Sequence, residues 1–227
     1  MTCNEWIDEF VKDKTFADVG GLWGVVNEKV TVAAQAGAVK TTMIDMQPLG
    51  NELWKKFYDR CATEGVVCNN SIEANIDDSD FPQKVGNYDI VHCSGVIYHC
   101  PNPLYTVSQL AKITNYILIL ASTVIEAKIK NDKGEISVGT GGGLFVPALN
   151  NDQKKIISHF YKEVGASSII GIDEALQNSW SLENYAPWWW LLTTELIASF
   201  LEVCGFNVRE ICREWDGRTA YFMAVKK

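Results

Sequence analysis

The stretch FADVGGLWG, residues 16–24, places an acidic residue and three glycines at the end of an apolar run. A carboxylate followed by a sharp turn at the end of a strand is typical of a nucleoside or dinucleotide site. The backbone can turn and approach a ligand closely at Gly20, Gly21 and Gly24. Leu22, however, stands where a dinucleotide fingerprint needs its middle glycine. The stretch therefore favours a nucleoside ligand that carries no phosphate groups.

Two further loops supply groups that adenosine needs. Asp45 ends an apolar run 25 positions after Gly20 and is followed by Met46, so it can accept hydrogen bonds from both ribose hydroxyls. The segment ANIDDSDFP, residues 74–82, follows the next predicted strand, and a side chain there can receive the adenine amino group. The candidates in this segment are Asn75, Ile76 and Asp77. Together the three loops predict an adenosine site.

Alternating strands and helices must position these loops. The spacing predicts strands over 15–20, 39–46, 66–76, 88–99 and 116–123, with helices over 5–13, 25–36, 51–65 and 103–114. Such alternation implies crossover connections and a parallel sheet. Residues 126–192 break the rhythm. A helix over 193–206 and two strands joined at Asp216-Gly217, a hairpin signal, then follow.

The order and spacing of these features resemble the class I methyltransferases that use S-adenosylmethionine (SAM), with Asp18-Val-Gly-Gly-Leu-Trp-Gly24 as the glycine motif. The resemblance covers about 16–124 and 193–227. It implies SAM as the cofactor and an α/β fold, doubly wound, with a mostly parallel sheet of seven strands and a reversed last strand. Residues 1–227 then form a single domain with a lid-like insertion at 126–192. The departure from the family pattern is Leu22. Trp23 either covers the methionine tail of SAM or packs into the helix below the loop, and we expect the packing.

The stretch YDIVHCSGVIYHCPNPL, residues 88–104, carries the fourth strand and the loop after it. Its GVIYH part resembles a stretch of the tRNA wobble-uridine carboxymethyltransferases and of many small-molecule methyltransferases. The resemblance implies that Cys93, Ser94 and Gly95 lie beside the cofactor. It places Tyr98 and His99 near the acceptor, where His99 is the base if the acceptor is a hydroxyl. The alternative is that His99 caps the helix that follows.

The same stretch contains soft metal ligands, namely His92, Cys93, His99 and Cys100. His92 and Cys93 are adjacent on a strand and therefore point to opposite faces. The spacing also differs from that of zinc sites, so we predict no metal.

The insertion supplies the remaining specificity. Its glycine-rich segment 139–147 is flexible enough to form a lid. The stretch NYAPWWWLL, residues 184–192, places aromatic side chains around a proline, either as core or to bind sugar rings, flat heterocycles or apolar chains. The acceptor-side candidates are Asn184, Tyr185 and Trp188. We expect the insertion to cover the acceptor pocket and not to form an independent domain, because a segment rich in glycine, asparagine and single aromatic anchors would struggle to bury a core of its own.

Composition limits the class of protein. The chain has 227 residues and a net charge of −8, which disfavours nucleic acid as a partner. No apolar run is long enough for a membrane span, the first residues are too polar for a signal peptide, and seven unpaired cysteines suit the cytoplasm. We predict a cytoplasmic SAM-dependent methyltransferase acting on an oxygen or nitrogen of a small molecule or sugar moiety.

Three alternatives stay open. One is an RNA base-modifying methyl- or carboxymethyltransferase, which the net charge opposes. Another is a non-catalytic SAM-binding partner protein, which the intact acids and glycines oppose. The third is a nicotinamide-dependent oxidoreductase, which the missing central glycine opposes. The sequence indicates no oligomeric state.

Overall fold

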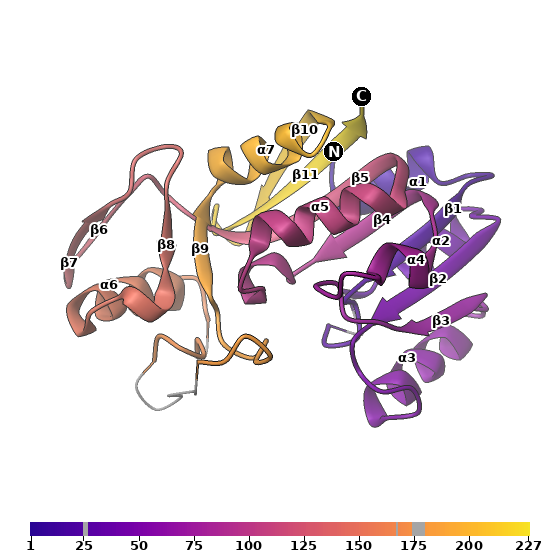
Figure 1. Ribbon diagram of the computed structural model, residues 1–227, viewed down its shortest axis with the longest axis horizontal. Helices are drawn as coiled ribbons and strands as arrows, with labels where there is room; N and C mark the ends of the chain where they lie inside the picture. Colours follow the sequence, from indigo (N-terminus) through magenta and orange to yellow (C-terminus); the bar gives the residue numbers. More distant parts are fainter. Residues whose placement is uncertain (25–26, 167, 174–179) are drawn as a thin grey trace.

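A mostly parallel β-sheet forms the centre of the molecule (Figure 1). The computed structural model describes residues 1–24, 27–166, 168–173 and 180–227. In these residues the sheet has nine strands, and one path through it runs β10-β11-β5-β4-β1-β2-β3. The strands on this path are β1 (Thr15–Val19), β2 (Lys40–Asp45), β3 (Asn70–Glu73), β4 (Tyr88–Ser94), β5 (Thr114–Ile125), β10 (Phe206–Glu214) and β11 (Thr219–Lys226).

The strand directions confirm a mixed α/β fold with a mostly parallel central sheet. The pairs β1–β2, β1–β4, β2–β3 and β4–β5 are parallel. β11 runs antiparallel to both β5 and β10, and the predicted hairpin at Asp216-Gly217 joins β10 to β11. The sheet exceeds the predicted seven strands, because β9 (Trp190–Thr193) pairs with the end of β5 and β8 (Gly143–Phe145) pairs with β9.

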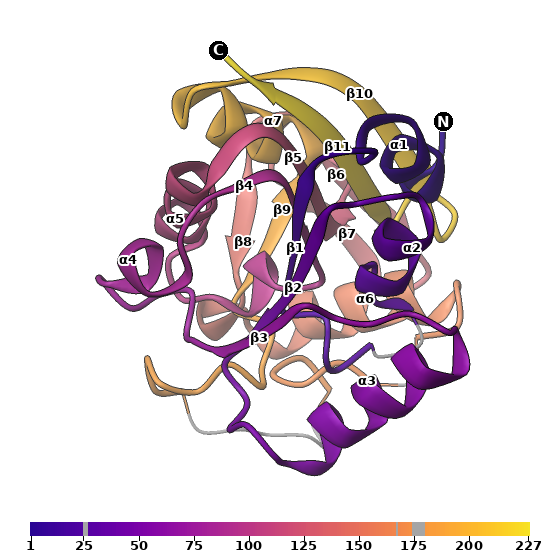
Figure 2. The same ribbon diagram turned by 90° about the vertical axis from the view of Figure 1, so that its right-hand side faces the viewer.

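Helices cover both faces of the sheet (Figure 2). One face carries α1 (Cys3–Phe10), α2 (Val30–Gln35) and α3 (Glu52–Thr63), and the other carries α4 (Phe81–Val85), α5 (Pro103–Ile113) and α7 (Thr194–Val203). Successive residues of a strand point to opposite faces. Phe16 and Ile90 therefore pack in the cluster under α1, whereas Ala17 and Val91 pack under α5. The helix predicted over 25–36 is shorter in the structure, and residues 25 and 26 lie outside the described residues.

The insertion after β5 buries a hydrophobic cluster, contrary to the expectation that it has no core. It contains β6 (Lys128–Asn131), β7 (Gly134–Ser137) and α6 (Asn151–Lys162), besides β8 and β9. Side chains from β6, β7, α6, β9 and the described segment between α6 and β9 meet in this cluster, among them Ile129, Ile136, Ile156, Ile169 and Leu191. These residues are far apart in the sequence and show no common period, so the sequence pattern did not indicate that they converge.

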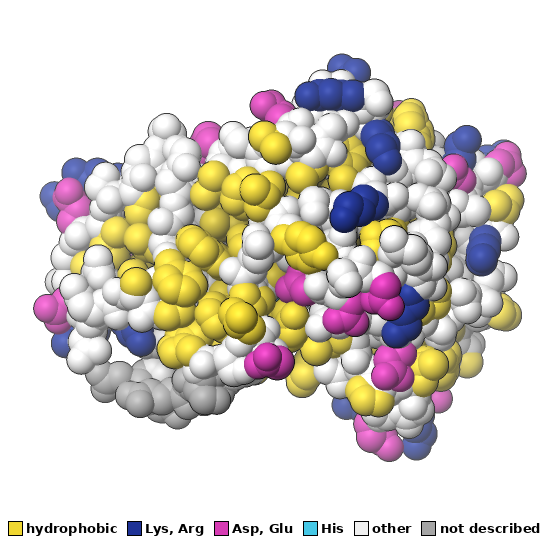
Figure 3. Space-filling view, in the orientation of Figure 1, with side chains coloured by type: hydrophobic (Ala, Val, Ile, Leu, Met, Phe, Trp, Pro, Cys, Tyr) yellow, Lys and Arg dark blue, Asp and Glu magenta, His cyan; other side chains and the backbone are white. Residues whose placement is uncertain are grey.

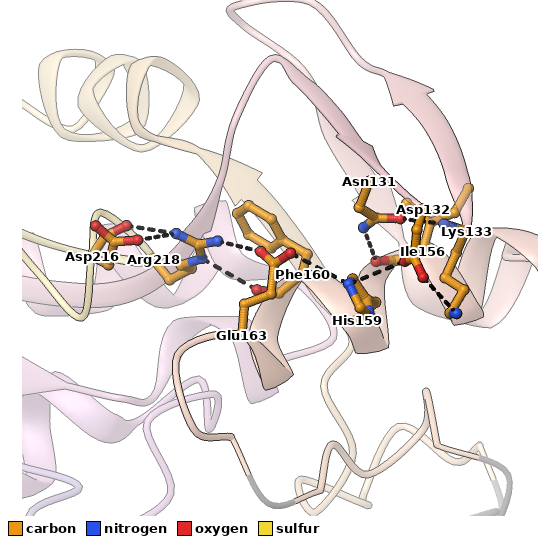
Figure 4. A network of polar contacts seen from close by, with 9 residues as sticks. All are labelled: Asn131, Asp132, Lys133, Ile156, His159, Phe160, Glu163, Asp216 and Arg218. Carbon is orange, nitrogen blue, oxygen red and sulfur yellow. Dashed lines mark hydrogen bonds and ion pairs between the residues drawn. The ribbon is translucent and has the colours of Figure 1, made fainter.

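Polar contacts fasten α6 to its surroundings (Figure 4). On one side, His159 Nε2 lies 3.1 Å from Asp132 Oδ1 in the hairpin of β6 and β7. On the other side, Arg218 Nε donates to the Phe160 carbonyl at 3.2 Å, and Arg218 Nη2 lies 2.9 Å from Glu163 Oε2. Arg218 directly precedes β11, so these contacts hold the insertion against the central sheet.

Part of the glycine-rich segment 139–147 forms a strand, β8, that pairs with β9. Gly143 begins β8, and the Gly142 carbonyl accepts hydrogen bonds from the N–H and the hydroxyl of Thr193. Phe145 of this segment stacks near Trp190, with ring centroids 5.0 Å apart. Figure 3 shows hydrophobic side chains gathered on this face, over the region of β8, β9 and the start of α5. The segment therefore builds structure between the insertion and the sheet.

Candidate active site

A cavity of about 1010 Å³ lies at the carboxyl ends of β1, β2, β3 and β4. This is where ligands bind in open parallel sheets. Most of the sequence-predicted site residues line it, namely Asp18, Gly20, Gly21, Gly24, Asp45, Met46, Asn75, Ile76, Ser94, Gly95, Tyr98, His99 and Tyr185. The fold thus brings together groups from three consecutive strand ends, the loop after β4, and the insertion.

The turn after β1 requires glycine at its first two positions. Gly20 has a φ of +78°, and a Cβ there would overlap the Val96 side chain. A Cβ on Gly21 would lie 2.8 Å from Asp18 Oδ2 and 2.9 Å from Met43 Cε. The loop after β4 therefore packs directly on the glycine turn, and the two loops form one wall of the cavity.

Leu22 replaces the expected glycine because it anchors the turn. Its side chain is fully buried against Met43, Trp54 and Phe57, below the cavity. The Leu22 N–H also donates to Asp45 Oδ2 at 3.3 Å, which links the ends of β1 and β2. The expectation that Trp23 packs into the helix below is wrong: its side chain is 77% exposed and lines the cavity. Leu22 occupies the buried position next to it.

Asp18 is already paired within the protein. Its Oδ1 lies 2.7 Å from His92 Nδ1 on the adjacent β4, and its Oδ2 accepts the Lys29 N–H at 2.7 Å. Burial lowers the pKa of His92, but the charge and hydrogen bond of Asp18 outweigh this and raise it to about 10. Asp18 therefore favours the imidazolium form of His92, and the two side chains form a buried ion pair.

Asp45 and Asn75 lie side by side along the cavity at the ends of β2 and β3. Asp45 accepts the N–H groups of Leu22 and Gln47, and burial raises the pKa of its carboxyl. A carboxylate can accept more hydrogen bonds than these two, so capacity for a ligand remains. The Asn75 amide donates to the Tyr185 hydroxyl at 3.2 Å. Tyr185 belongs to the insertion, so this contact joins the insertion to the predicted adenosine side.

The insertion also holds the loop after β4. Trp189 donates its N–H to the Tyr98 carbonyl at 2.8 Å, and the Trp188 ring packs on the Tyr98 ring with centroids 4.8 Å apart. His99 Nδ1 lies 3.1 Å from the Pro187 carbonyl. The segment just before β9 therefore fixes the position of Tyr98 and His99.

These contacts determine the protonation of His99. A carbonyl oxygen only accepts, so in the neutral ring the proton resides on Nδ1 and Nε2 keeps its lone pair. Burial lowers the pKa of His99 below its ordinary value of 6.5, with the nearby carbonyls opposing this shift. At neutral pH His99 is thus a neutral imidazole in the cavity wall that can take up a proton at Nε2. The alternative, that His99 caps the following helix, is wrong. The cap of α5 is Asn102, whose side chain accepts the Tyr105 N–H.

Four predicted site residues do not line the cavity. Cys93 is fully buried and points to the opposite face from His92, toward α5. Asp77 accepts a hydrogen bond from the Thr106 hydroxyl at 2.7 Å and ties its loop to α5. Asn184 forms a turn, in which its side chain accepts the Ala186 N–H. Trp188 packs against the aromatic rings beside it rather than facing the cavity.

The sequence analysis missed several residues that line the cavity. Lys29 lies next to Asp18 and, among the described residues, forms no ion pair. Glu214 of β10 and Tyr221 of β11 also line the cavity. These two residues are far in sequence from the glycine motif, so no pattern in the sequence indicated that they line the same cavity. The sequence suggests only a metal ligand at His92, whereas in the structure it lies opposite Asp18 in the register of β1 and β4 and pairs with it.

Two further properties bear on the class of site. Within the described ranges, no three His, Cys, Asp or Glu side chains are grouped so that they could hold a metal ion. None of the helices that the structure describes combines the length and the apolar character needed to cross a bilayer.

Comparisons with known proteins give matches by structure only. No family model matches the chain, and no curated protein matches it by sequence. The magnesium protoporphyrin IX methyltransferase of Synechocystis PCC 6803, solved with bound S-adenosylhomocysteine (SAH), is similar with a TM-score of 0.58 and 17% identity. That match covers 99% of this chain and 80% of the methyltransferase.

Two other solved structures are similar at the same level. The N-terminal domain of EvdMO1, in the presence of SAH and D-fucose, has a TM-score of 0.56 and 14% identity over 99% of this chain and 80% of that one. An O-methyltransferase family protein from Burkholderia thailandensis has a TM-score of 0.60 and 13% identity over 99% and 55% of the two chains. At these identities the likeness shows that this chain shares the fold of these three solved proteins.

Proposed function

We propose that the protein is a SAM-dependent methyltransferase that methylates an oxygen or nitrogen atom of a small molecule or sugar moiety. The observation that carries the proposal is the cavity itself. It joins a glycine turn, the buried acid Asp45 and the amide of Asn75 at three consecutive strand ends. Its volume of about 1010 Å³ is sufficient for the cofactor together with a small acceptor.

The cavity residues fit the parts of SAM in order. Asp45 would accept from the ribose hydroxyls, with the adenine next to Asn75 and Ile76. The methionine end would lie over Gly20 and toward the loop after β4. Lys29 would pair with its carboxylate, because it lines the cavity without an ion pair to any described residue, whereas His92 is matched by Asp18.

When bound, SAM supplies a methyl group on a positively charged sulfur, and an acceptor atom displaces the neutral thioether from that carbon. The protein has to align the acceptor with the C–S bond, exclude water and remove one proton. A Cβ added at Gly95 would lie 3.7 Å from the Tyr98 hydroxyl. This hydroxyl would therefore border the point of methyl transfer. His99 would take the acceptor proton at Nε2, while Pro187 holds the Nδ1 proton.

The charges of the cavity favour this function over the alternatives. The carboxylates of Asp18, Glu28, Asp45 and Glu214 line it. His92 pairs with Asp18 and Arg60 pairs with Glu28, which leaves Asp45 and Glu214 against the cation of Lys29 among the described lining residues. Such a lining suits a cofactor that carries a positive sulfonium. It repels the two phosphates of a nicotinamide dinucleotide and the phosphate backbone of RNA.

Parallel calorimetric titrations with SAM, SAH and NAD test the proposal. We expect both SAM and SAH to bind with one site per chain, and NAD to give no heat of binding. Binding of NAD in preference to SAM would assign the cavity to a dinucleotide. Binding of SAH without methylation in a broad acceptor screen would favour the non-catalytic partner protein.

A further inference from the structure

One side of the cavity is a shelf formed by β4, β5 and β11. Ser94 pairs in register with Ala121 of β5, and Ala121 pairs in register with Tyr221 of β11. Side chains at paired positions of neighbouring strands point to the same face. The small Ala121 side chain between them lets the Tyr221 phenol extend toward Ser94, and both Ser94 and Tyr221 line the cavity.

Glu214 borders the far end of this shelf. It pairs with Thr219, two residues before Tyr221 on the same strand, so the side chains of Glu214 and Tyr221 are on the same face. Glu214 is exposed, and the described residues form no ion pair with it. Burial and the negative charge of Glu214 raise the pKa of Tyr221 to about 12, whereas Ser94 lowers it. The phenol therefore keeps its proton and can donate it.

The wall across the strand ends is of a different kind. Tyr98, Tyr185 and Ile170 line it, and they present aromatic and apolar surface. A ring lying against this wall would extend a substituent across Ser94 toward Glu214. The two walls together offer an aromatic contact, a hydrogen-bond donor and an uncompensated carboxylate.

We propose that the shelf of Ser94, Ala121, Tyr221 and Glu214 binds the acceptor, and that it selects ring compounds with an amine or hydroxyl substituent and rejects those with a carboxylate or phosphate. This proposal rests on the proposed methyltransferase function, because the shelf adjoins the predicted methyl position at Ser94. A protonated amine gains the charge of Glu214, whereas an anion in the same place is repelled. Neutral hydroxyls are bound through hydrogen bonds alone.

Three probes with one ring and different charges test the selection. Tyramine, 4-ethylphenol and 3-(4-hydroxyphenyl)propionate are titrated into protein saturated with SAH, and methylation of each is measured with SAM. We expect tyramine to bind at least about fivefold more tightly than the propionate, the scale of one partly exposed ion pair. We expect 4-ethylphenol to fall between them.

Variants assign the selection to the shelf. Glu214→Gln should bring the three affinities within about twofold of one another, whereas the control Glu202→Gln, on the outer face of α7, should leave their order unchanged. Tyr221→Phe should weaken all three by about 3- to 10-fold. Equal binding of the amine and the carboxylate, an unchanged order in Glu214→Gln, or no binding of any probe to the SAH complex would overturn the proposal. Failure of the wild type to bind SAH at all would instead contradict the proposed function.

Discussion

The two walls of the cavity are built in different ways. The wall predicted to bind the cofactor comes from consecutive strand ends, and each of its groups lies within a few residues of a strand that positions it. The opposite wall depends on contacts across long stretches of sequence. Pro187 fixes His99 from 88 positions away, and Tyr185 reaches Asn75 across 110 positions. Most groups of the predicted cofactor wall are therefore positioned locally by the sheet, whereas the positions of Tyr98 and His99 depend on the insertion.

This difference changes the role of the insertion. Residues 139–147 are predicted to form a lid, but none of them lines the cavity. Their strand β8 pairs with β9 instead. The segment before β9 instead grips the loop after β4 through Trp188 and Trp189. We infer that the insertion acts as a fixed support that orients Tyr98 and His99.

The largest effect is expected at His99, in the loop after β4 that the insertion contacts. His99→Ala should lower turnover by about 10²–10⁴, the range of a lost general base for a hydroxyl acceptor, with SAM affinity close to that of the wild type. Because burial lowers the pKa of His99, the acid limb of the turnover–pH profile should lie below pH 6.5. Full turnover in the variant, or an equal loss in the control His159→Ala on α6, would remove His99 from the mechanism.

The next largest effect concerns stability and arises within the central sheet, between β1 and β4. His92→Gln leaves Asp18 buried without its cation and should reduce the free energy of unfolding by about 3–5 kcal/mol near pH 6. Folding raises the pKa of His92 from 6.5 to about 10, so its contribution is complete below pH 6.5 and is lost as the pH rises toward 10. The difference from the wild type should therefore shrink over this interval in denaturant titrations. A difference that grows with pH would contradict the ion pair.

A smaller effect isolates the cofactor wall. Asp45→Ala should weaken SAM binding by about 1.5–3 kcal/mol, as expected for charge-assisted hydrogen bonds to the ribose, without unfolding the protein. Calorimetry on this variant and on Asp59→Ala, an exposed acid of α3, provides the measurement and its control. An unchanged dissociation constant for a folded Asp45→Ala would place the ribose elsewhere.

The smallest effect tests whether the insertion contributes to cofactor binding. Tyr185→Phe removes the hydroxyl that bonds to Asn75 and should weaken SAM binding by about 0.5–1.5 kcal/mol. Tyr116→Phe, at an exposed position of β5, should have no effect. Equal SAM affinities in Tyr185→Phe and the wild type would contradict this prediction. They would show that the Tyr185 hydroxyl contributes nothing to cofactor binding.

The sequence predicted the alternating strands and helices because their apolar residues recur with the period of the element. It placed Asp18, Asp45 and Asn75 at strand ends, and these residues line the cavity. It could not predict β8 and β9, because the aromatic run and the glycines before it have no period of their own and become strands only by pairing with β5 and with each other. Tyr221 and Glu214 reach the cavity through strand register, which no single segment encodes.

The crystal structure of the protein with SAH tests the account most directly. We expect the ribose hydroxyls on Asp45, the adenine beside Asn75 and Ile76, and the sulfur facing Ser94 and Gly95. Tyr98 and His99 should border the open side of that sulfur, with His99 still bonded to Pro187. A ligand bound outside this cavity, or bound with its adenine at the His99 end, would contradict the assignment of the two walls.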